Sequence, residues 1–174
     1  MRTSAASIVA AVVLASACGE SGDKIPVDTA APVATTPAPV VAGTFTLDDS
    51  RRLRWLDGRW RGFEPNGNKF YEEYRWLNDL TIAMHAYSDS TFTKASDISR
   101  VEFRGGTISN ESRTARWVAT RLDSTGIDFG PHHGATNHFT WAQESPTTWN
   151  ATLRWTDKNG RPQSVVYALH RFGR

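Results

Sequence analysis

The stretch Trp149–Thr156, WNATLRWT, alternates between two kinds of side chain. Its odd-numbered positions are tryptophan, alanine, leucine and tryptophan, whereas every even-numbered position is polar. Successive side chains of a β-strand point to opposite faces. This period of two therefore predicts a strand with one face against an apolar core.

Similar alternation occurs through much of the chain. Leu80–Tyr87, LTIAMHAY, places leucine, isoleucine, methionine and alanine on one face. The pattern is less regular in residues 69–76, 99–105, 115–122, 137–143 and 163–172. Because Pro, Asn, Asp and Gly stand between many of these segments, we expect about ten short antiparallel strands joined by tight turns. Such a pattern is typical of a sandwich or a closed barrel.

One short helix is predicted before the strands. Thr46 and Asp49 have the spacing of a capping box, Leu53 and Leu56 share one helical face, and Gly58 is placed to end the helix. A helix followed by a continuous meander favours an all-β, up-and-down, lipocalin-like barrel with the helix as a plug. All seven tryptophans lie in residues 44–174, which we take as this barrel domain.

The N-terminus has the features of an export signal. Residues 1–17 combine Arg2 with an apolar run that is too short to span a bilayer, so we predict a cleaved signal peptide. The segment ending at Cys18 resembles a bacterial lipobox, although Ala15–Ala17 also fits an ordinary A-x-A cleavage site. Cys18 is the only cysteine, which favours its lipidation, because an exported chain with one cysteine cannot form an internal disulfide.

Residues 18–43 are predicted to be a tether. They are rich in Pro, Ala and Thr and contain no aromatic residue, so they cannot bury enough surface to fold. Gly19 rather than aspartate after the cysteine is typical of lipoproteins sorted to the outer membrane. The expected location is therefore the bacterial cell envelope, with the barrel anchored to the outer membrane and facing the periplasm.

The charge and the missing motifs argue against several functions. The net charge is only +2 and the basic residues are scattered, so no nucleic-acid partner is expected. The chain has no Gly-x-Ser-x-Gly elbow, no HExxH motif and no phosphate loop. These absences argue against an enzyme without excluding one, and no cofactor is predicted.

Two segments carry a resemblance to a known family. Leu53–Gly62, LRWLDGRWRG, and Phe70–Trp76, FYEEYRW, resemble the start of the bacterial lipocalin-like family DUF6265. More broadly, Gly58-Arg59-Trp60 resembles the G-x-W signature of the calycin superfamily. That resemblance implies a barrel closed by Trp60 on the first strand and covered by an arginine of the last strand, here Arg171.

The resemblance also exposes two difficulties. Phe129, Pro131 and His133 (or His132) correspond to a late family motif, but the Asp-Phe-Pro that should follow is missing. Nitrobindin-type haem barrels use a histidine near the chain end, for which His170 is the candidate. Neighbours on a strand point to opposite faces, so an inward Arg171 makes His170 point outward, and we favour that arrangement.

The candidate ligand-binding residues fall into two groups. Glu72, Tyr74 and Trp76 share one strand face, whose aromatic character places Glu72 inside the barrel. A buried carboxylate needs a partner, so Glu72 either pairs with an inward arginine or binds a ligand. The second group is His132, His133 and His138 in the segment GPHHGATNHF.

The histidine segment has two interpretations. It is either a polar turn between strands or a site at the barrel rim that binds a ligand or metal. The histidines are weak metal candidates, since His132 and His133 are adjacent and no cysteine or acid completes a set unless Asp128 folds back.

The predicted function is a small-ligand-binding barrel that takes a partly apolar molecule at its mouth. Two alternatives remain: an enzyme or a metal- or haem-binding barrel using residues 132–138, and a solid barrel that binds an envelope protein.

Overall fold

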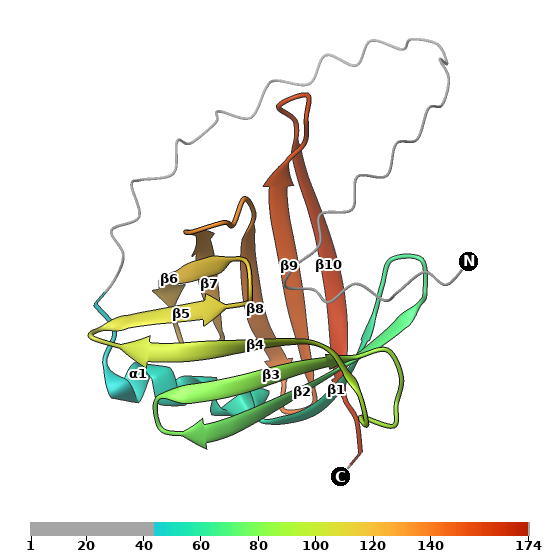
Figure 1. Cartoon of the computed structure of the whole chain (residues 1–174), viewed down its shortest axis with the longest axis horizontal. Helices are drawn as coiled ribbons and strands as arrows, with labels where there is room; N and C mark the ends of the chain where they lie inside the picture. The colour runs from blue at the N-terminus through green and yellow to red at the C-terminus, as the bar shows by residue number, and fades with distance from the viewer. Residues whose placement is uncertain (1–43, 174) are drawn as a thin grey trace.

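The computed structural model describes residues 44–173, which form one closed antiparallel barrel (Figure 1). The predicted signal peptide, Cys18 and the tether lie outside the described residues. Each strand pairs with its neighbours in sequence, and β1 closes the barrel against β10. The predicted up-and-down barrel of about ten strands is therefore confirmed.

The strands are short and follow one another through tight turns. They are β1 Gly58–Phe63, β2 Lys69–Asn78, β3 Thr81–Tyr87, β4 Ala95–Arg104, β5 Thr107–Glu111, β6 Arg116–Leu122, β7 Gly126–Pro131, β8 His138–Ser145, β9 Thr148–Thr156 and β10 Pro162–Arg171.

A short helical segment precedes β1. It consists of the α-helix α1, Leu47–Arg51, and the 3-10 helix η1, Arg52–Leu56. The capping box is present, because the Asp49 amide donates to the Thr46 hydroxyl oxygen and the Asp49 carboxylate accepts from the Thr46 amide. Among the residues that the structure describes, no helix has the length and apolarity needed to cross a membrane.

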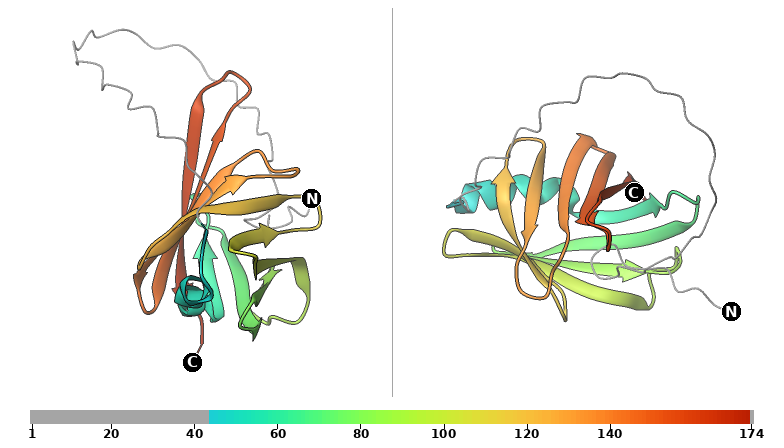
Figure 2. Two further views of the ribbon diagram at one scale, coloured as in Figure 1. Left: turned by 90° about the vertical axis from the view of Figure 1, so that its left-hand side faces the viewer. Right: turned by 90° about the horizontal axis from the view of Figure 1, so that it is seen from above.

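The helix lies at one end of the barrel, which we call the plug end (Figure 2). The Phe45 amide donates to the carbonyl of Gly106 in the β4–β5 turn, and Arg51 pairs with Asp79 in the β2–β3 turn. Since the strands alternate in direction, the loops β1–β2, β3–β4, β5–β6, β7–β8 and β9–β10 meet at the opposite end, which we call the open end.

Large aromatic side chains fill the plug half of the barrel. Trp149 is 1% exposed and makes edge contacts with Trp55, Trp60, Tyr74 and Trp141 at centroid distances of 5.7, 6.0, 5.8 and 5.9 Å. Leu53 and Leu56 of the helical segment are buried in the same core. The helix is thus part of the core, as a plug should be.

A crevice remains between the helical segment and the sheet. Its volume is about 10 Å³, close to the smallest space that holds one water molecule. It is lined by Ser50, Leu53, Trp76, Leu80, Ile82, Val101, Phe103 and Ile108. This crevice is too small to admit an organic ligand.

Candidate functional site

The β9–β10 hairpin forms a wall at the open end, where it extends beyond its neighbours (Figure 1). β8 pairs with β9 only as far as Arg154, and β1 pairs with β10 only from Ala168 onward. Apart from the exposed Gln163, the inward-facing side chains beyond or near these limits are apolar or aromatic and half-buried. They are Leu153, Trp155, Val165 and Tyr167.

Glu72 and Tyr74 lie inside the barrel on β2. Glu72 is 1% exposed and Tyr74 is 2% exposed. The Tyr74 hydroxyl donates to Oε2 of Glu72 at 2.8 Å. Oε1 of Glu72 has no hydrogen-bond partner among the described residues. The sequence placed both side chains inside correctly, but Glu72 is paired with a tyrosine and not with the inward arginine considered above.

Burial changes the acidity of both groups. Desolvation raises the pKa of Glu72 to about 7, although the hydrogen bond from Tyr74 acts in the opposite direction. Burial also raises the pKa of Tyr74, and the nearby Glu72 carboxylate raises it further. The interior therefore holds a carboxyl group that changes charge near neutral pH.

A second inward polar side chain lacks partners. Asn110 on β5 is completely buried, and neither its Oδ1 nor its Nδ2 has a hydrogen bond within residues 44–173. It lies between the inward residues Val101 and Trp117 in the sheet register. Buried amide atoms that lack partners carry a substantial desolvation cost, so Asn110 and Glu72 are both suited to receive a bound polar group.

Trp76, the third candidate on β2, belongs to the plug end. It is half-buried and lines the crevice described above. The Cζ atom of Arg54 lies 4.6 Å from the centroid of its ring. The structure therefore keeps Trp76 on the same face as Glu72 and Tyr74 but separates it from the open end.

The arginines near the double glutamate pair with Glu73. Glu73 faces outward, where Arg59 donates at 2.9 Å, Arg75 at 3.4 Å and the Tyr87 hydroxyl at 3.2 Å. Burial acts to raise the pKa of Glu73, but the hydrogen bond and attraction from Arg59 outweigh it and lower the pKa. Adjacent glutamates thus have opposite environments because they lie on opposite faces of β2.

A small aromatic cluster covers this outer face. The β3–β4 loop folds back and places Phe92 against Tyr71, Tyr87 and Phe172, with ring centroids 5.8, 5.0 and 5.6 Å away. Arg59 lies over the Phe92 ring at 4.6 Å. The sequence analysis missed this cluster, since Phe92 is in a polar loop and its partners are distant in sequence.

The barrel closes at the plug end with the contact that the resemblance implied. The Arg171 guanidinium lies 4.3 Å above the Trp60 ring and donates to the carbonyl oxygens of Asp57 and Trp55. Gly58 has a φ of +121°, and a Cβ there would lie 2.4 Å from Nη1 of Arg171. His170 is exposed beside Phe63 on the outer face, which removes the geometry of a haem ligand inside the barrel.

The histidine segment is an ordered turn with exposed side chains. The His132 amide donates to the Arg116 carbonyl, and the Arg116 amide donates to the His133 carbonyl. His132, His133 and His138 are all exposed. Residues 44–173 contain no group of three or more His, Cys, Asp or Glu side chains arranged to hold a metal ion. The structure thus does not bring the candidate metal ligands together.

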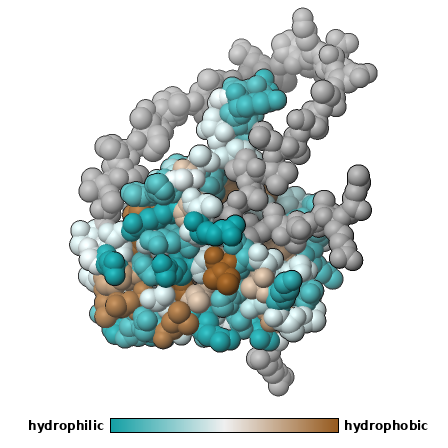
Figure 3. Space-filling view, viewed as in Figure 1, coloured by the Kyte–Doolittle hydropathy of each residue, from teal (hydrophilic) through white to brown (hydrophobic). Residues whose placement is uncertain are grey.

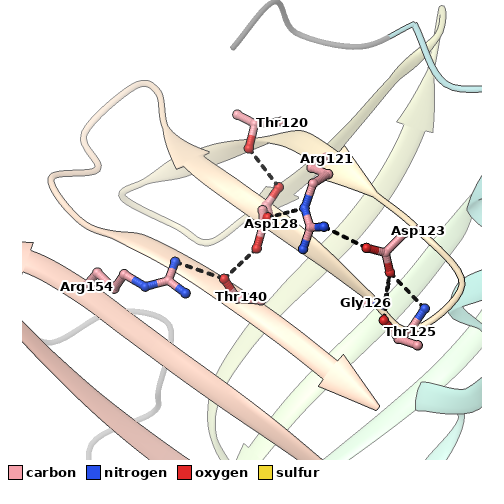
Figure 4. A network of polar contacts seen from close by, with 8 residues as sticks. All are labelled: Thr120, Arg121, Asp123, Thr125, Gly126, Asp128, Thr140 and Arg154. Carbon is pink, nitrogen blue, oxygen red and sulfur yellow. Dashed lines mark hydrogen bonds and ion pairs between the residues drawn. The ribbon is translucent and has the colours of Figure 1, made fainter. Parts of the chain in front are cut away.

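Asp128, the acid nearest to that segment, is held elsewhere (Figure 4). It accepts hydrogen bonds from Arg121 at 2.7 Å and from the Thr140 hydroxyl at 2.5 Å. Arg154 donates to the same hydroxyl at 3.1 Å. This network lies on the outer face of β6–β9, so Asp128 is a surface structural residue and not a ligand shared with the histidines.

The outer surface is largely hydrophilic on the face seen in Figure 3, with hydrophobic side chains gathered beside the plug helix. Two of the large exposed apolar side chains, Leu77 and Leu80, lie close together where β2 turns into β3. The other two, Ile98 on β4 and Val166 on β10, lie on separate strands.

No protein-family model and no curated protein matches the chain. The solved structures that are similar to it include the following two. "Structure of EF1p2_mFAP2b bound to DFHBI" covers 71% of this chain and 98% of that protein at 15% identity, with a TM-score of 0.35. "Structure of a redesigned beta barrel, b11L5F_LGL" covers 68% and 93% at 14% identity, with a TM-score of 0.33.

Proposed function

We propose that this chain is a small-ligand-binding barrel whose ligand enters at the open end. The observation that carries the proposal is Glu72, a fully buried side chain with one carboxyl oxygen that has no hydrogen-bond partner among the described residues. Above it, the β9–β10 hairpin presents a half-buried apolar and aromatic wall. Ligand sites in proteins combine these features: mostly apolar walls and a few polar groups that orient the ligand.

The wall supplies the second part of the argument. A tryptophan side chain has a large apolar surface, and removing it from water stabilises a complex. Trp155 lies beyond the last residue of β9 that pairs with β8, so its inward face is not covered by that strand. A partly apolar molecule at this position would bury Trp155.

The binding proposal is tested by comparing the wild-type protein with Trp155→Ala. We expect the wild type to bind one or more members of a panel of small aromatic compounds, with tryptophan fluorescence as the readout. The substitution should weaken that binding by about tenfold or more, because it removes a large apolar contact.

Val166→Ala is the matched control, since Val166 is 53% exposed on the outer side of the same hairpin. Its binding should equal that of the wild type. Equal losses in both variants, or no binding by the wild type, would contradict a ligand site at the open end.

We further propose that the barrel is an exported lipoprotein of the bacterial outer membrane. Cys18 after a signal-like segment, followed by the Pro-, Ala- and Thr-rich residues 19–43, supports this proposal. We expect the wild type to incorporate labelled fatty acid and to fractionate with outer membranes, whereas Cys18→Ala should do neither. Soluble export of the unlabelled wild type would contradict the anchor.

The relation to the DUF6265 and calycin barrels also stays a proposal. Leu53–Gly62 and the closure of Trp60 by Arg171 support it. A member structure that lacked this arginine–tryptophan closure would count against it.

A further inference from the structure

Two neighbouring leucines at the plug end are exposed to solvent. Leu77 is 60% exposed and Leu80 is 48% exposed, and they flank the β2–β3 turn beside the helical segment (Figure 1). The half-buried rings of Trp76 and Phe103 adjoin Leu80 along the crevice described above. We call these four residues the plug-end patch. A cluster of exposed apolar side chains, unlike a single one, is typical of an interaction surface.

The other large exposed apolar side chains do not form such a cluster. Ile98 lies opposite His85 on the outer face of β4. Val166 lies on the outer side of the β9–β10 hairpin, towards the open end. Within residues 44–173, Leu77 and Leu80 are thus the large exposed apolar side chains that lie together, and they do so at the plug end.

The charges beside the patch compensate one another. Asp79, in the turn between the two leucines, pairs with Arg51 and with Arg54 at 2.8 Å each, and Arg51 also pairs with Asp48 at 2.8 Å. The acid in the turn therefore does not leave a net negative charge that would repel anionic headgroups. The Arg54 guanidinium also lies 4.6 Å from the centre of the Trp76 ring. Tryptophan and arginine side by side are suited to the boundary between an apolar and a polar phase.

The chain enters the barrel at the same end. The described residues begin at Thr44, and the Phe45 amide donates to the Gly106 carbonyl in the β4–β5 turn at 2.8 Å. The predicted tether, residues 18–43, therefore joins the barrel at the plug end. A tether of this length has an average span of about 30 Å, so it would hold the plug end near a membrane that carried an acylated Cys18. At the resulting effective concentration, even a weak contact between the patch and lipid is populated.

We infer that the plug-end patch contacts the lipid surface to which the chain is anchored. This inference rests on the proposed lipid anchor and adds an orientation to it. Leu77 and Leu80 enter the boundary between the headgroups and the acyl chains, and the arginines beside them lie at the level of the lipid phosphates. The plug end then faces the membrane, and the open end with its apolar wall faces away from it.

Vesicle binding by an unlipidated chain tests the contact itself. Residues 19–174 retain the whole closed barrel and lack both the signal segment and Cys18, so neither contributes to binding. The probe is a vesicle of phosphatidylethanolamine and anionic phosphatidylglycerol at a ratio of about three to one, and co-sedimentation gives the partition coefficient. We expect Leu77→Ser combined with Leu80→Ser to lower this coefficient by about tenfold or more, because two apolar side chains no longer leave water on binding.

Ile98→Ser combined with Val166→Ser is the matched control, since it removes as many exposed apolar side chains from positions away from the plug end. It should bind vesicles as well as the unsubstituted chain does. Leu77→Ser alone is the second variant, because Leu77 is the more exposed leucine. It should weaken binding by about threefold even if the double leucine variant is unstable. Circular dichroism checks that each variant keeps the barrel.

The outcomes separate the contact from the anchor on which it rests. Loss of vesicle binding in the leucine variants alone would support the contact, whether or not the full chain takes up labelled fatty acid. Equal binding by all variants, equal losses in both double variants, or no binding by the unsubstituted chain would overturn the contact, while fatty-acid labelling would still support the anchor. Leucine-dependent dimerisation without vesicle binding, measured by analytical ultracentrifugation, would assign the patch to a second copy of the chain and overturn the inference.

Discussion

Replacing Trp149 by alanine is expected to lower the free energy of unfolding by about 3–5 kcal/mol, the usual cost of deleting a buried aromatic side chain. Trp149 is 1% exposed and contacts rings from the helical segment, β1, β2 and β8. Its removal leaves a cavity where several elements meet, and these elements cannot all move inward to fill it. Urea denaturation of both proteins measures the difference.

Trp155→Ala is the matched comparison on the same face of the same strand. Trp155 is half-buried on the extended part of the hairpin, so its loss should cost about 1 kcal/mol or less. The contrast would show that the stabilising contacts of β9 lie at its plug end, while the open end of the hairpin contributes little to stability. A cost as large as that of Trp149 would mean that the wall belongs to the core, and the proposed entrance would lose its main surface.

The alternation that predicts β9 also shows what such a pattern leaves open. The inward face of Trp149–Thr156 was correctly predicted, yet only Trp149 and Ala151 are fully buried on it. The alternation predicts which side chains face inward, but it does not predict how far the neighbouring strands extend. Because β8 pairs with β9 only as far as Arg154, Trp155 lies on a part of β9 that β8 does not cover. Where β8 stops depends on the register between the two strands, which the local pattern does not contain.

Strand β7 is not among the alternating segments of the sequence. Its residues GIDFGP include glycine and proline, which are uncommon inside strands. In the structure a Cβ on Gly126 would lie 2.3 Å from the Trp141 carbonyl oxygen, so close approach of two strands requires this residue. The reason for the glycine is a contact with residues about fifteen positions later, which no local pattern contains.

Part of the candidate site was predictable from the same kind of alternation. Alternation in FYEEYRW placed Glu72 inside and Glu73 outside, and both positions are correct. The choice of partners was not predictable, because it depends on which side chains reach across the sheet. Tyr74 reaches Glu72 from its own strand, whereas Arg59 reaches Glu73 from β1. The histidine-rich segment was a candidate ligand or metal site because of its composition, but its histidine side chains are exposed.

Glu72→Gln is expected to change how stability depends on pH. The folded protein holds the Glu72 proton up to a pKa of about 7, whereas the usual value of 4.5 applies to the unfolded chain. Between these values the folded state binds more protons, so raising the pH lowers the stability of the wild type. The contribution of Glu72 should fall by about 3 kcal/mol from pH 4.5 to above pH 7, since each pKa unit corresponds to about 1.4 kcal/mol.

Glutamine keeps the volume of Glu72 and an oxygen that accepts from Tyr74, but it does not titrate. The free energy of unfolding of the wild type should therefore fall, relative to that of Glu72→Gln, as the pH rises through 7. The other ionisable groups on this face, Tyr74, Asp97, Tyr167 and Arg171, are present in both proteins, so their contributions largely cancel. Denaturation curves in the absence of ligand, measured at several pH values, give the difference directly.

Glu73→Gln provides a control of opposite sign one residue away. Despite burial, pairing with Arg59 lowers the pKa of Glu73, so its stabilising contribution is present above pH 4.5 and is lost as the pH falls through the lowered pKa. Glu73→Gln should therefore be less stable than the wild type above pH 4.5, and this difference should disappear in acid. Glu72→Gln should instead gain stability relative to the wild type as the pH rises. Parallel pH profiles for the wild type and Glu72→Gln would mean that the ionised carboxylate already has a partner inside the protein. In that case Oε1 would need no ligand, and Glu72 would no longer support the proposed binding function.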